Sequence, residues 1–252
     1  MKYKALIPRL SHRLFFLPLV FFALLWAGCD STEDPPQGEL EVQDLVSGTG
    51  EEAVAGASLL VNYVGRLEDG TVFDTSEGRL TPVAFTLGVG QVIEGWDVGL
   101  QGMRVGGQRR LIIPPNLAFG SRGVEGSVPS NATVTFEITL EAIINEVIIE
   151  DQVIGDGTAL ENGMEAVVDY IGLLNPEGDV FDASEFRGAP FRFIVGNGEV
   201  IEGWDVGVLG MQVGGRRLLI IPPNQAYGQF GFPGSVPPWA VLTFRIDLLE
   251  AN

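Results

Sequence analysis

The chain of 252 residues carries 33 Asp and Glu against 15 Lys and Arg, and 46% of its residues are hydrophobic, so it can bury one large core or two small ones. Four of those bases (Lys2, Lys4, Arg9 and Arg13) lie before residue 29, where no acid occurs. The remainder is a polyanion, which disfavours binding to DNA or RNA and to anionic lipid surfaces.

Several chemistries are excluded because their residues are missing from the body of the chain. The one histidine is His12, the one cysteine is Cys29, and both lysines precede residue 5. A Ser-His-Asp triad therefore lacks its imidazole, His and Cys zinc sites lack their ligands, and a phosphate-binding P-loop lacks its lysine. Carboxylate chemistry, oxygen-ligated Ca²⁺ and catalysis by shape without a nucleophile remain.

The first 28 residues have the layout of a secretory signal peptide, with a basic stretch up to residue 13 and an apolar run over Leu14–Ala27. The run ends in Ala-Gly-Cys, which resembles a bacterial lipoprotein signal, so we expect a lipidated Cys29 followed by a flexible tether over residues 29–39. The protein would then be exported and lipid-anchored in the cell envelope, on either the inner or the outer membrane. The alternatives are an uncleaved anchor and an incidental free thiol.

A long internal repeat organises the rest of the chain. The sequence VIEGWDVG occurs at residues 92–99 and again at 200–207, and residues 102–120 return in similar form at 210–228. The offset of 108 residues is too long for a solenoid repeat and is typical of a complete small domain.

We therefore predict two tandem domains, over residues 40–146 and 147–252. Residues 143–153 at the junction contain neither Gly nor Pro, which favours a strand-to-strand joint over a flexible linker. The second copy has one additional residue, which we assign to the turn over residues 175–178 opposite residues 68–70.

Within the first copy the local patterns predict mostly strands. Residues 59–67 alternate apolar and polar or small side chains. The single helix candidate starts near Glu94 and runs to Leu100, and glycines weaken it. Strands are predicted again at 110–113, before two prolines, and at 133–140. Each domain is thus expected to be α+β, with a curved antiparallel sheet of five or six strands wrapped around one short helix.

Both copies share one constellation: a Tyr in a strand, then Phe-Asp, then Val-Ile-x-Gly-Trp, then an aromatic residue before Gly, and a Phe in the last strand. With this constellation the sequence resembles the FKBP-type peptidyl-prolyl cis/trans isomerases, over nearly the whole of both repeats. The resemblance implies a proline-binding pocket that works without a cofactor.

The resemblance also assigns site residues position by position. Those at catalytic positions are Asp182, Tyr170, Trp204, Tyr227 and Phe181 in the second domain and Asp74, Tyr63 and Trp96 in the first. Those at substrate-binding positions are Phe191, Glu199, Val200, Ile201, Val236 and Phe244 in the second domain and Phe73, Gln91, Val92, Ile93, Phe119, Val128 and Phe136 in the first. No metal ligand is expected.

In the family the Trp indole lies under the proline ring, the backbone N–H of the Ile binds a substrate carbonyl, and the Asp and Tyr lie near the rotating carbonyl. The second domain matches every position. The first departs twice, because Val83 stands at an aromatic position and Phe119 replaces a Tyr. We therefore expect domain 2 to be the more active copy.

Taken singly, each residue has an ordinary structural interpretation. A Trp on a short helix is usually core, and an Asp after Phe is usually a turn or cap residue. Asp97 and Asp205 are expected on a solvated helix face, and the glycines of the repeated helix motif are expected to serve the backbone. A whole set in register, twice, nevertheless favours a site.

We therefore expect a prolyl isomerase that assists the folding of exported proteins. Its partners would be proline-containing polypeptides and macrolide immunosuppressants, without nucleic acid, and it would meet the membrane only through the lipid anchor. A module that merely holds proline segments is the alternative. A glycoside hydrolase with paired carboxylates is disfavoured, because only Asp74 and Asp182 recur in the pocket, one in each domain.

Overall fold

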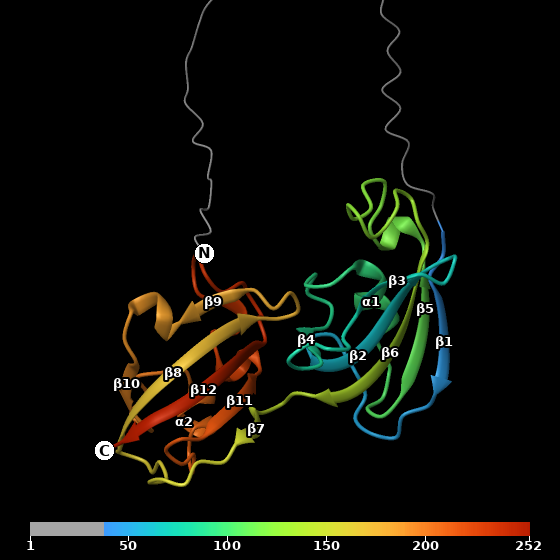
Figure 1. Ribbon diagram of the computed structural model, residues 1–252. Coiled ribbons are helices and arrows are strands. Elements are labelled where there is room, and N and C mark those ends of the chain that lie inside the picture. The colour runs from blue at the N-terminus through green and yellow to red at the C-terminus, as the bar shows by residue number, and fades with distance from the viewer. Residues whose placement is uncertain (1–37) are drawn as a thin grey trace, which may run out of the picture. The chain divides into compact units, whose positions relative to one another are not determined.

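The computed structural model describes residues 38–252, which belong to one compact unit (Figure 1). The predicted signal peptide, Cys29 and all but the last two residues of the tether lie outside the described residues. No helix within residues 38–252 has the length and apolar character needed to cross a membrane.

Six antiparallel strands and one short helix form the first domain. The strands are β1 (Glu41–Val46), β2 (Ser58–Leu67), β3 (Val72–Thr75), β4 (Val83–Thr86), β5 (Gln108–Ile113) and β6 (Val134–Ile143). Their order is β1-β5-β6-β2-β3, and β4 also pairs with β2. Helix α1 spans Glu94–Gly99, and a 3-10 turn, η1, spans Pro115–Leu117.

The second domain repeats this arrangement. Its strands are β7 (Ile148–Val153), β8 (Glu165–Leu174), β9 (Val180–Ala183), β10 (Phe191–Ile194), β11 (Arg216–Ile221) and β12 (Leu242–Ala251). Their order is β7-β11-β12-β8-β10, with β9 also on β8. Helix α2 spans Glu202–Gly207, and the 3-10 turns are η2 (Ser184–Arg187), η3 (Pro223–Gln225) and η4 (Gly228–Phe230).

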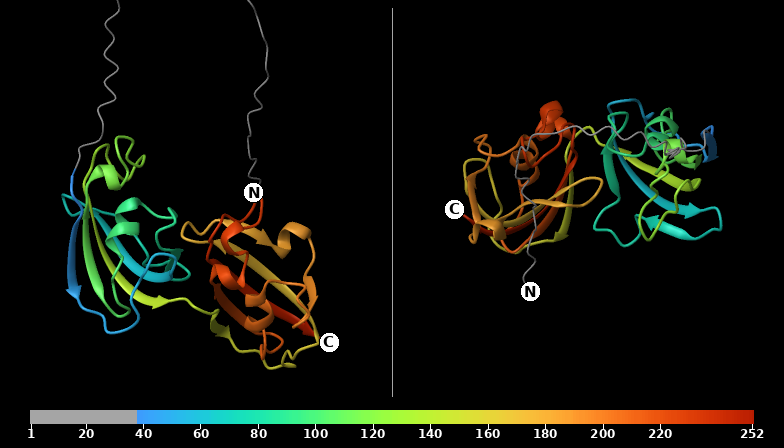
Figure 2. Two further views of the ribbon diagram at one scale, coloured as in Figure 1. Left: turned by 180° about the vertical axis from the view of Figure 1, so that it is seen from behind. Right: turned by 90° about the horizontal axis from the view of Figure 1, so that it is seen from above.

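The predicted α+β class and the two tandem domains are confirmed, and each short helix lies on the concave side of its sheet (Figure 2). The alternating pattern of the sequence has the expected result in β5, where every second residue is buried. The predicted joint between the domains is the short connection from β6 to β7, which contains the predicted boundary after residue 146.

The helix glycines are needed because the helix lies directly on a strand. A Cβ at Gly95 would fall within 2.9 Å of Ile113 Cδ1, and a Cβ at Gly203 would fall equally close to Ile221 Cδ1. Such contacts are too short for real side chains, so only glycine lets the helix approach β5 or β11 this closely. The expectation that these glycines serve the backbone is confirmed.

A buried arginine binds the backbone carbonyls at the C-terminal end of each helix, and it lies on β5 in the first domain and on β11 in the second. Arg109, 8% exposed, donates from Nη1 to the carbonyls of Gly99 at 2.8 Å and Gln101 at 2.9 Å, and from Nε to Asp44 Oδ1 at 2.6 Å. Arg217 makes the equivalent bonds in the second domain. A cation at this position donates hydrogen bonds to carbonyl oxygens that have no partner within the helix.

Asp97 and Asp205, which were expected on a solvated helix face, are partly exposed, and each also binds the loop that precedes its helix. The Asp97 carboxylate accepts the backbone N–H groups of Gly88 at 2.7 Å and Gly90 at 2.9 Å, and Asp205 binds the equivalent loop. These carboxylates therefore hold the loop that precedes each helix.

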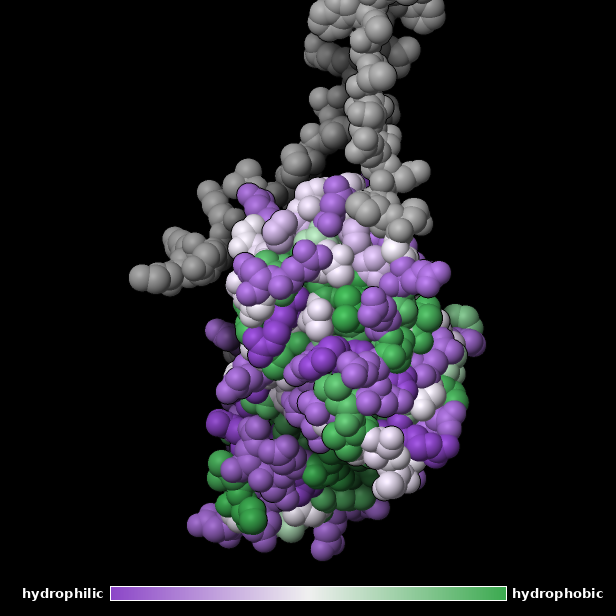
Figure 3. All heavy atoms as spheres, turned by 90° about the vertical axis from the view of Figure 1, so that its right-hand side faces the viewer, coloured by the Kyte–Doolittle hydropathy of each residue, from purple (hydrophilic) through white to green (hydrophobic). Residues whose placement is uncertain are grey.

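Two large hydrophobic clusters form the cores, one within each domain, and they contain Trp96 and Trp204. A third, smaller cluster joins residues of both domains: Leu60, Ala84, Ile144, Ile220 and Val241. On the face shown in Figure 3, hydrophobic residues are interspersed among hydrophilic ones, as on most protein surfaces.

Candidate functional site

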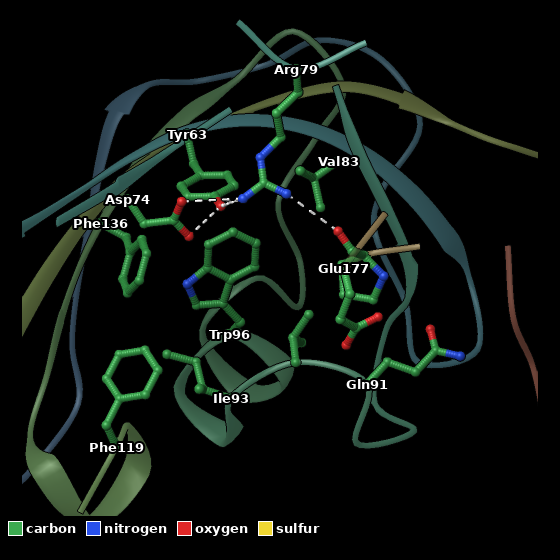
Figure 4. A pocket seen from close by; sticks show the side chains of 12 residues that line it. Tyr63, Asp74, Arg79, Val83, Gln91, Ile93, Trp96, Phe119, Phe136 and Glu177 are labelled. Atoms are coloured by element: carbon green, nitrogen blue, oxygen red, sulfur yellow. Dashed lines mark hydrogen bonds and ion pairs between the residues drawn. The ribbon is translucent and has the colours of Figure 1, made fainter. Parts of the chain in front are cut away.

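A tyrosine, an aspartate and an arginine form a hydrogen-bonded network in the first domain (Figure 4). Pairing of β2 with β3 brings Tyr63 and Asp74 together, and the Tyr63 hydroxyl donates to Asp74 Oδ2 at 2.6 Å. Arg79 Nη2 donates to the Tyr63 hydroxyl at 2.9 Å and to Asp74 Oδ1 at 3.1 Å. The phenol is thereby held between a carboxylate and a guanidinium.

The second domain contains the same network. The Tyr170 hydroxyl donates to Asp182 Oδ2 at 2.6 Å, and Arg187 Nη2 donates to the same oxygen at 2.9 Å. Arg187 Nη1 also donates to the Tyr170 hydroxyl. The two sites therefore present the same charges in the same arrangement.

Burial makes the site tyrosines harder to ionise. Desolvation, followed by the hydrogen bond to the neighbouring aspartate, raises the pKa of Tyr63 and of Tyr170. Desolvation likewise raises the pKa of Tyr227, with a smaller contribution from the charge of Asp182. All three hydroxyls remain hydrogen-bond donors around neutral pH.

An indole forms the floor of each site. The Trp96 ring meets the rings of Tyr63 and Phe136 edge to face, with centroids 5.0 and 5.1 Å apart. The Trp204 ring meets Tyr170 and Phe244 in the same way, at 5.0 and 5.2 Å. The buried Nε1 atoms of both tryptophans have no hydrogen-bond partner among the described residues.

Each helix places an unpaired backbone donor at the site. Ile93 is the N-cap residue of α1, with φ −58° and ψ 146°, and Ile201 caps α2 with φ −62° and ψ 148°. Within the described part of the chain, neither N–H group has an acceptor, since both residues lie just outside the helical hydrogen-bond ladder. Each N–H is therefore available to a carbonyl brought in by a ligand.

A cavity of about 650 Å³ opens over this floor in the first domain. Eight of the predicted residues line it: Tyr63, Asp74, Gln91, Val92, Ile93, Trp96, Phe119 and Phe136. Val83 adds to the wall. Phe73 packs on the rings of Phe119 and Phe136, and Val128 is buried in the core, so these two predicted residues support the wall from behind.

The predicted residues of the second domain also gather around their indole. Tyr170, Trp204, Val236 and Phe244 lie in the buried core, and the residues packed against it include Phe181, Phe191, Val200, Ile201 and Tyr227. Tyr227 also faces Phe232, whose ring centroid lies 5.5 Å away.

Phe191 marks the main difference between the two sites. Its ring lies 5.9 Å from Tyr170 and 6.1 Å from Trp204, and the Arg187 guanidinium lies 5.8 Å above it. Val83 occupies the corresponding position in the first domain and supplies no ring. The second site therefore has an aromatic wall that the first domain does not build from its own residues.

Gln91 and Glu199 hold the loop beside the site. The Gln91 Oε1 atom accepts the backbone N–H of Thr86 at 2.8 Å, and Glu199 Oε2 accepts that of Ile194 at 3.1 Å. Glu199 Oε1 also accepts from the Asn197 amide, and these bonds lower the pKa of Glu199. The two side chains therefore support the loop, and Gln91 also lines the cavity.

Four residues of the sites were missed. Arg79 and Arg187 recur at the offset of the repeat, so the repeat itself contains the signal that would have found them. Pro176 and Glu177 belong to the second domain yet line the cavity of the first, and no local sequence pattern predicts this contact between the domains. Residues 38–252 contain no cluster of three or more His, Cys, Asp or Glu that could hold a metal ion.

Comparison with known proteins agrees with this geometry. Residues 49–141 and 157–249 each match the family of FKBP-type peptidyl-prolyl cis-trans isomerases. The chain belongs to this family. Both FKBP domains thus carry the network, the indole floor and the free N–H described above.

The chain is 39% identical over 206 residues to peptidyl-prolyl cis-trans isomerase FKBP10 from Mus musculus, which covers 80% of this chain and 35% of that protein. It is 50% identical over 103 residues to the FK506-binding protein of Neisseria meningitidis, covering 41% of this chain and 94% of that protein. The three FKBP domains of wheat FKBP73 align at 27% identity with a TM-score of 0.40, over 84% of this chain and 94% of that structure. The chain spans about a third of the length of FKBP10.

Proposed function

We propose that the protein is a peptidyl-prolyl cis/trans isomerase with a site in each FKBP domain. The observation that carries the proposal is the repeated combination of an aromatic floor and an unpaired backbone N–H beside a Tyr-Asp-Arg network. FKBP10 is named as such an isomerase, and residues of both domains match the family.

Such a site can act on an amide without breaking a bond. Rotation about an X-Pro bond faces a barrier of about 18 to 20 kcal/mol, because the twisted amide loses resonance. The twisted amide is less polar than the planar one, so an apolar cavity stabilises it relative to the planar state. Each 1.36 kcal/mol of that difference increases the rate about tenfold.

The described side chains have separate roles in this proposal. Trp96 or Trp204 receives the proline ring, and the N–H of Ile93 or Ile201 donates to a substrate carbonyl. Asp74 or Asp182, held by the tyrosine and the arginine, lies at the polar side of the rotating bond. No proton is transferred and no cofactor is needed, so we expect a rate that is nearly constant between pH 6 and pH 8.

We propose that domain 2 is the more active copy. Tyr227 keeps a hydroxyl that Phe119 lacks, and Phe191 adds an aromatic wall at the position of Val83. The same differences favour the alternative for domain 1, which would hold proline-containing segments while isomerising them slowly.

The biological setting is also a proposal. The apolar run before Cys29 supports export and lipid anchoring to a bacterial membrane, and a folding role for exported proteins would follow from that location. The relative from Neisseria meningitidis is named for FK506 binding, which supports macrolide binding by this chain.

The decisive experiment removes the backbone donor from one domain at a time. Proline adopts φ near −65°, so Ile93→Pro and Ile201→Pro suit the observed backbone and delete an N–H that no protein group uses. We expect each change to lower the kcat/KM of its own domain by about two- to tenfold, as expected for one lost hydrogen bond.

Activity is measured by cis/trans exchange of prolyl peptides with the full chain. Ile93→Val and Ile201→Val are the matched controls, because they keep the N–H and a branched side chain. Adding Asp74→Ala or Asp182→Ala to the proline variant should silence that domain further and shows which copy supplies most of the rate. Peptides that bind the unaltered chain without faster exchange would support the binding module instead.

A further inference from the structure

The turn between β8 and β9 of the second domain forms part of the cavity wall of the first. Pro176 and Glu177 of this turn line the cavity together with Val83 and Trp96 (Figure 4). Arg79 Nη1 donates to the Pro176 carbonyl at 3.4 Å while its Nη2 serves Tyr63 and Asp74. The turn is therefore bonded to the arginine of the first domain's own network.

The turn is anchored to its own domain. Asn175 is buried, and its Nδ2 donates to the Val241 carbonyl at 3.2 Å and to Thr243 Oγ1 at 2.9 Å. Because β12 contains Thr243, the position of the turn is determined by the sheet of the second domain.

Further contacts hold the two domains together beside the cavity. Thr86 Oγ1 donates to the Trp239 carbonyl at 2.9 Å, and Gln91 Nε2 donates to the Pro238 carbonyl at 3.2 Å. The apolar cluster that contains Leu60 and Val241 lies between the domains as well. Polar and apolar contacts thus place the turn where it meets the cavity.

The turn lies where the first domain lacks an aromatic ring. Val83 is only 4% exposed, although it is smaller than Phe191 at the corresponding position, which is partly exposed. Val83 lines the cavity with Pro176 and a second hollow with Asn175 and Gly178, so the turn covers it on two sides. Pro176 thereby supplies an apolar wall that the first domain does not provide itself.

Glu177 adds a charge that is not neutralised. Among the residues lining the cavity, Asp74 is paired with Arg79, whereas no described residue forms a salt bridge or hydrogen bond with the Glu177 side chain. Figure 4 shows its carboxylate on the same side of the cavity as Gln91, which is itself neutral. The outer wall of the cavity is therefore negatively charged.

We propose that the substrate site of domain 1 is completed by domain 2, with Pro176 as its outer apolar wall and Glu177 as a specificity residue that selects prolyl peptides with a basic residue next to the proline. This inference rests on the proposed function, since it names the substrate class of the same site. It also gives the additional residue of the second repeat a role.

The test uses the full chain with domain 2 silenced by Ile201→Pro and Asp182→Ala. The probes are short prolyl peptides that carry Arg, Ala or Glu before or after the proline and are otherwise identical. We expect kcat/KM and peptide affinity to favour Arg over Glu by about two- to fivefold at low salt, as for an exposed ion pair, and the preference to weaken at 1 M salt.

Glu177→Gln should abolish this preference, and Glu177→Lys should reverse it. Asp179→Asn is the matched control, because it removes the same charge from the same turn but outside the cavity, and it should leave the preference intact. With domain 1 silenced by Ile93→Pro and Asp74→Ala instead, Glu177→Gln should change nothing.

Pro176→Gly tests the apolar wall. We expect it to raise KM severalfold for every peptide when domain 1 is the active copy, and to have no effect when domain 2 is. Hydrogen exchange of β8 and β12 shows whether the variant remains folded, and Pro176→Ala provides a second, milder change.

Unchanged Arg/Glu ratios in both Glu177 variants would overturn the proposal. Failure of the proposed function would look different. In that case neither the unaltered chain nor any variant would accelerate the cis/trans exchange of the peptides. Peptide binding would still favour Arg over Glu, and Glu177→Gln would still abolish that preference.

Discussion

Gly203→Ala would test whether the close contact between α2 and β11 positions the indole of the second site. Alanine is the better helix former by about 0.8 to 1.0 kcal/mol, so the change would stabilise an unconstrained helix. The new Cβ, however, would lie within 2.9 Å of Ile221 Cδ1 and closer still to its Cγ2, whereas ordinary contacts begin near 3.4 Å.

Neither partner can move away easily. Ile221 is fully buried and β-branched, so its rotamers are restricted, and the C-terminal end of α2 is held by Arg217. Overpacking of this kind costs about 1 to 3 kcal/mol, which outweighs the gain in helix propensity. We expect a net loss of up to about 2 kcal/mol and a displaced Trp204, and therefore a lower kcat/KM for domain 2.

The assay is urea unfolding followed through NMR signals of the second domain, together with prolyl exchange in a chain whose first domain is silenced. Val206→Ala is the control, since Val206 lies on the same helix and is 43% exposed. Ile221→Ala should cost less stability in the Gly203→Ala background than in the unaltered chain, because it removes the atoms that the new Cβ would overlap. A more stable variant with unchanged activity would refute the reasoning.

Three further predictions concern other parts of the chain. The hydrogen bond from Arg109 lowers the pKa of Asp44 in the folded protein. This pair should therefore stabilise the first domain fully above the ordinary carboxyl pKa of about 3.9, and the stabilisation should be lost as the pH falls through the lower pKa of the folded state. The acid dependence of the free energy of unfolding should weaken in Asp44→Asn, and an unchanged profile would contradict this. Phe119→Tyr should raise macrolide affinity in domain 1, and Tyr227→Phe should lower it in domain 2, each by about two- to tenfold in calorimetric titrations; equal affinities before and after would show that the hydroxyl is irrelevant. Mass spectrometry of membrane-extracted protein should find a diacylglyceryl group on Cys29, whereas peptides that run through Gly28 into Cys29 in most of the mature pool would exclude lipidation.

Much of the architecture could be predicted from the sequence because the signals are local. Alternation along residues 59–67 predicts a half-buried strand, and β2 spans Ser58–Leu67. The exact repeat of VIEGWDVG predicts the same short helix twice, and α1 and α2 have identical sequences and an Ile at the N-cap. The indole, the tyrosine and the aspartate of each site follow from the same repeat, since they lie on these elements.

Side chains that act over long distances in the sequence could not be placed in this way. The role of Asp97 in holding a loop could not be predicted, because a helical pattern does not show that the backbone N–H groups of Gly88 and Gly90 donate to this carboxylate. The wall formed by Pro176 depends on a contact with Arg79, 97 residues earlier in the chain. Such contacts exist only when both sheets are folded and the domains are packed together, so the tertiary structure alone decides which residues complete the first cavity.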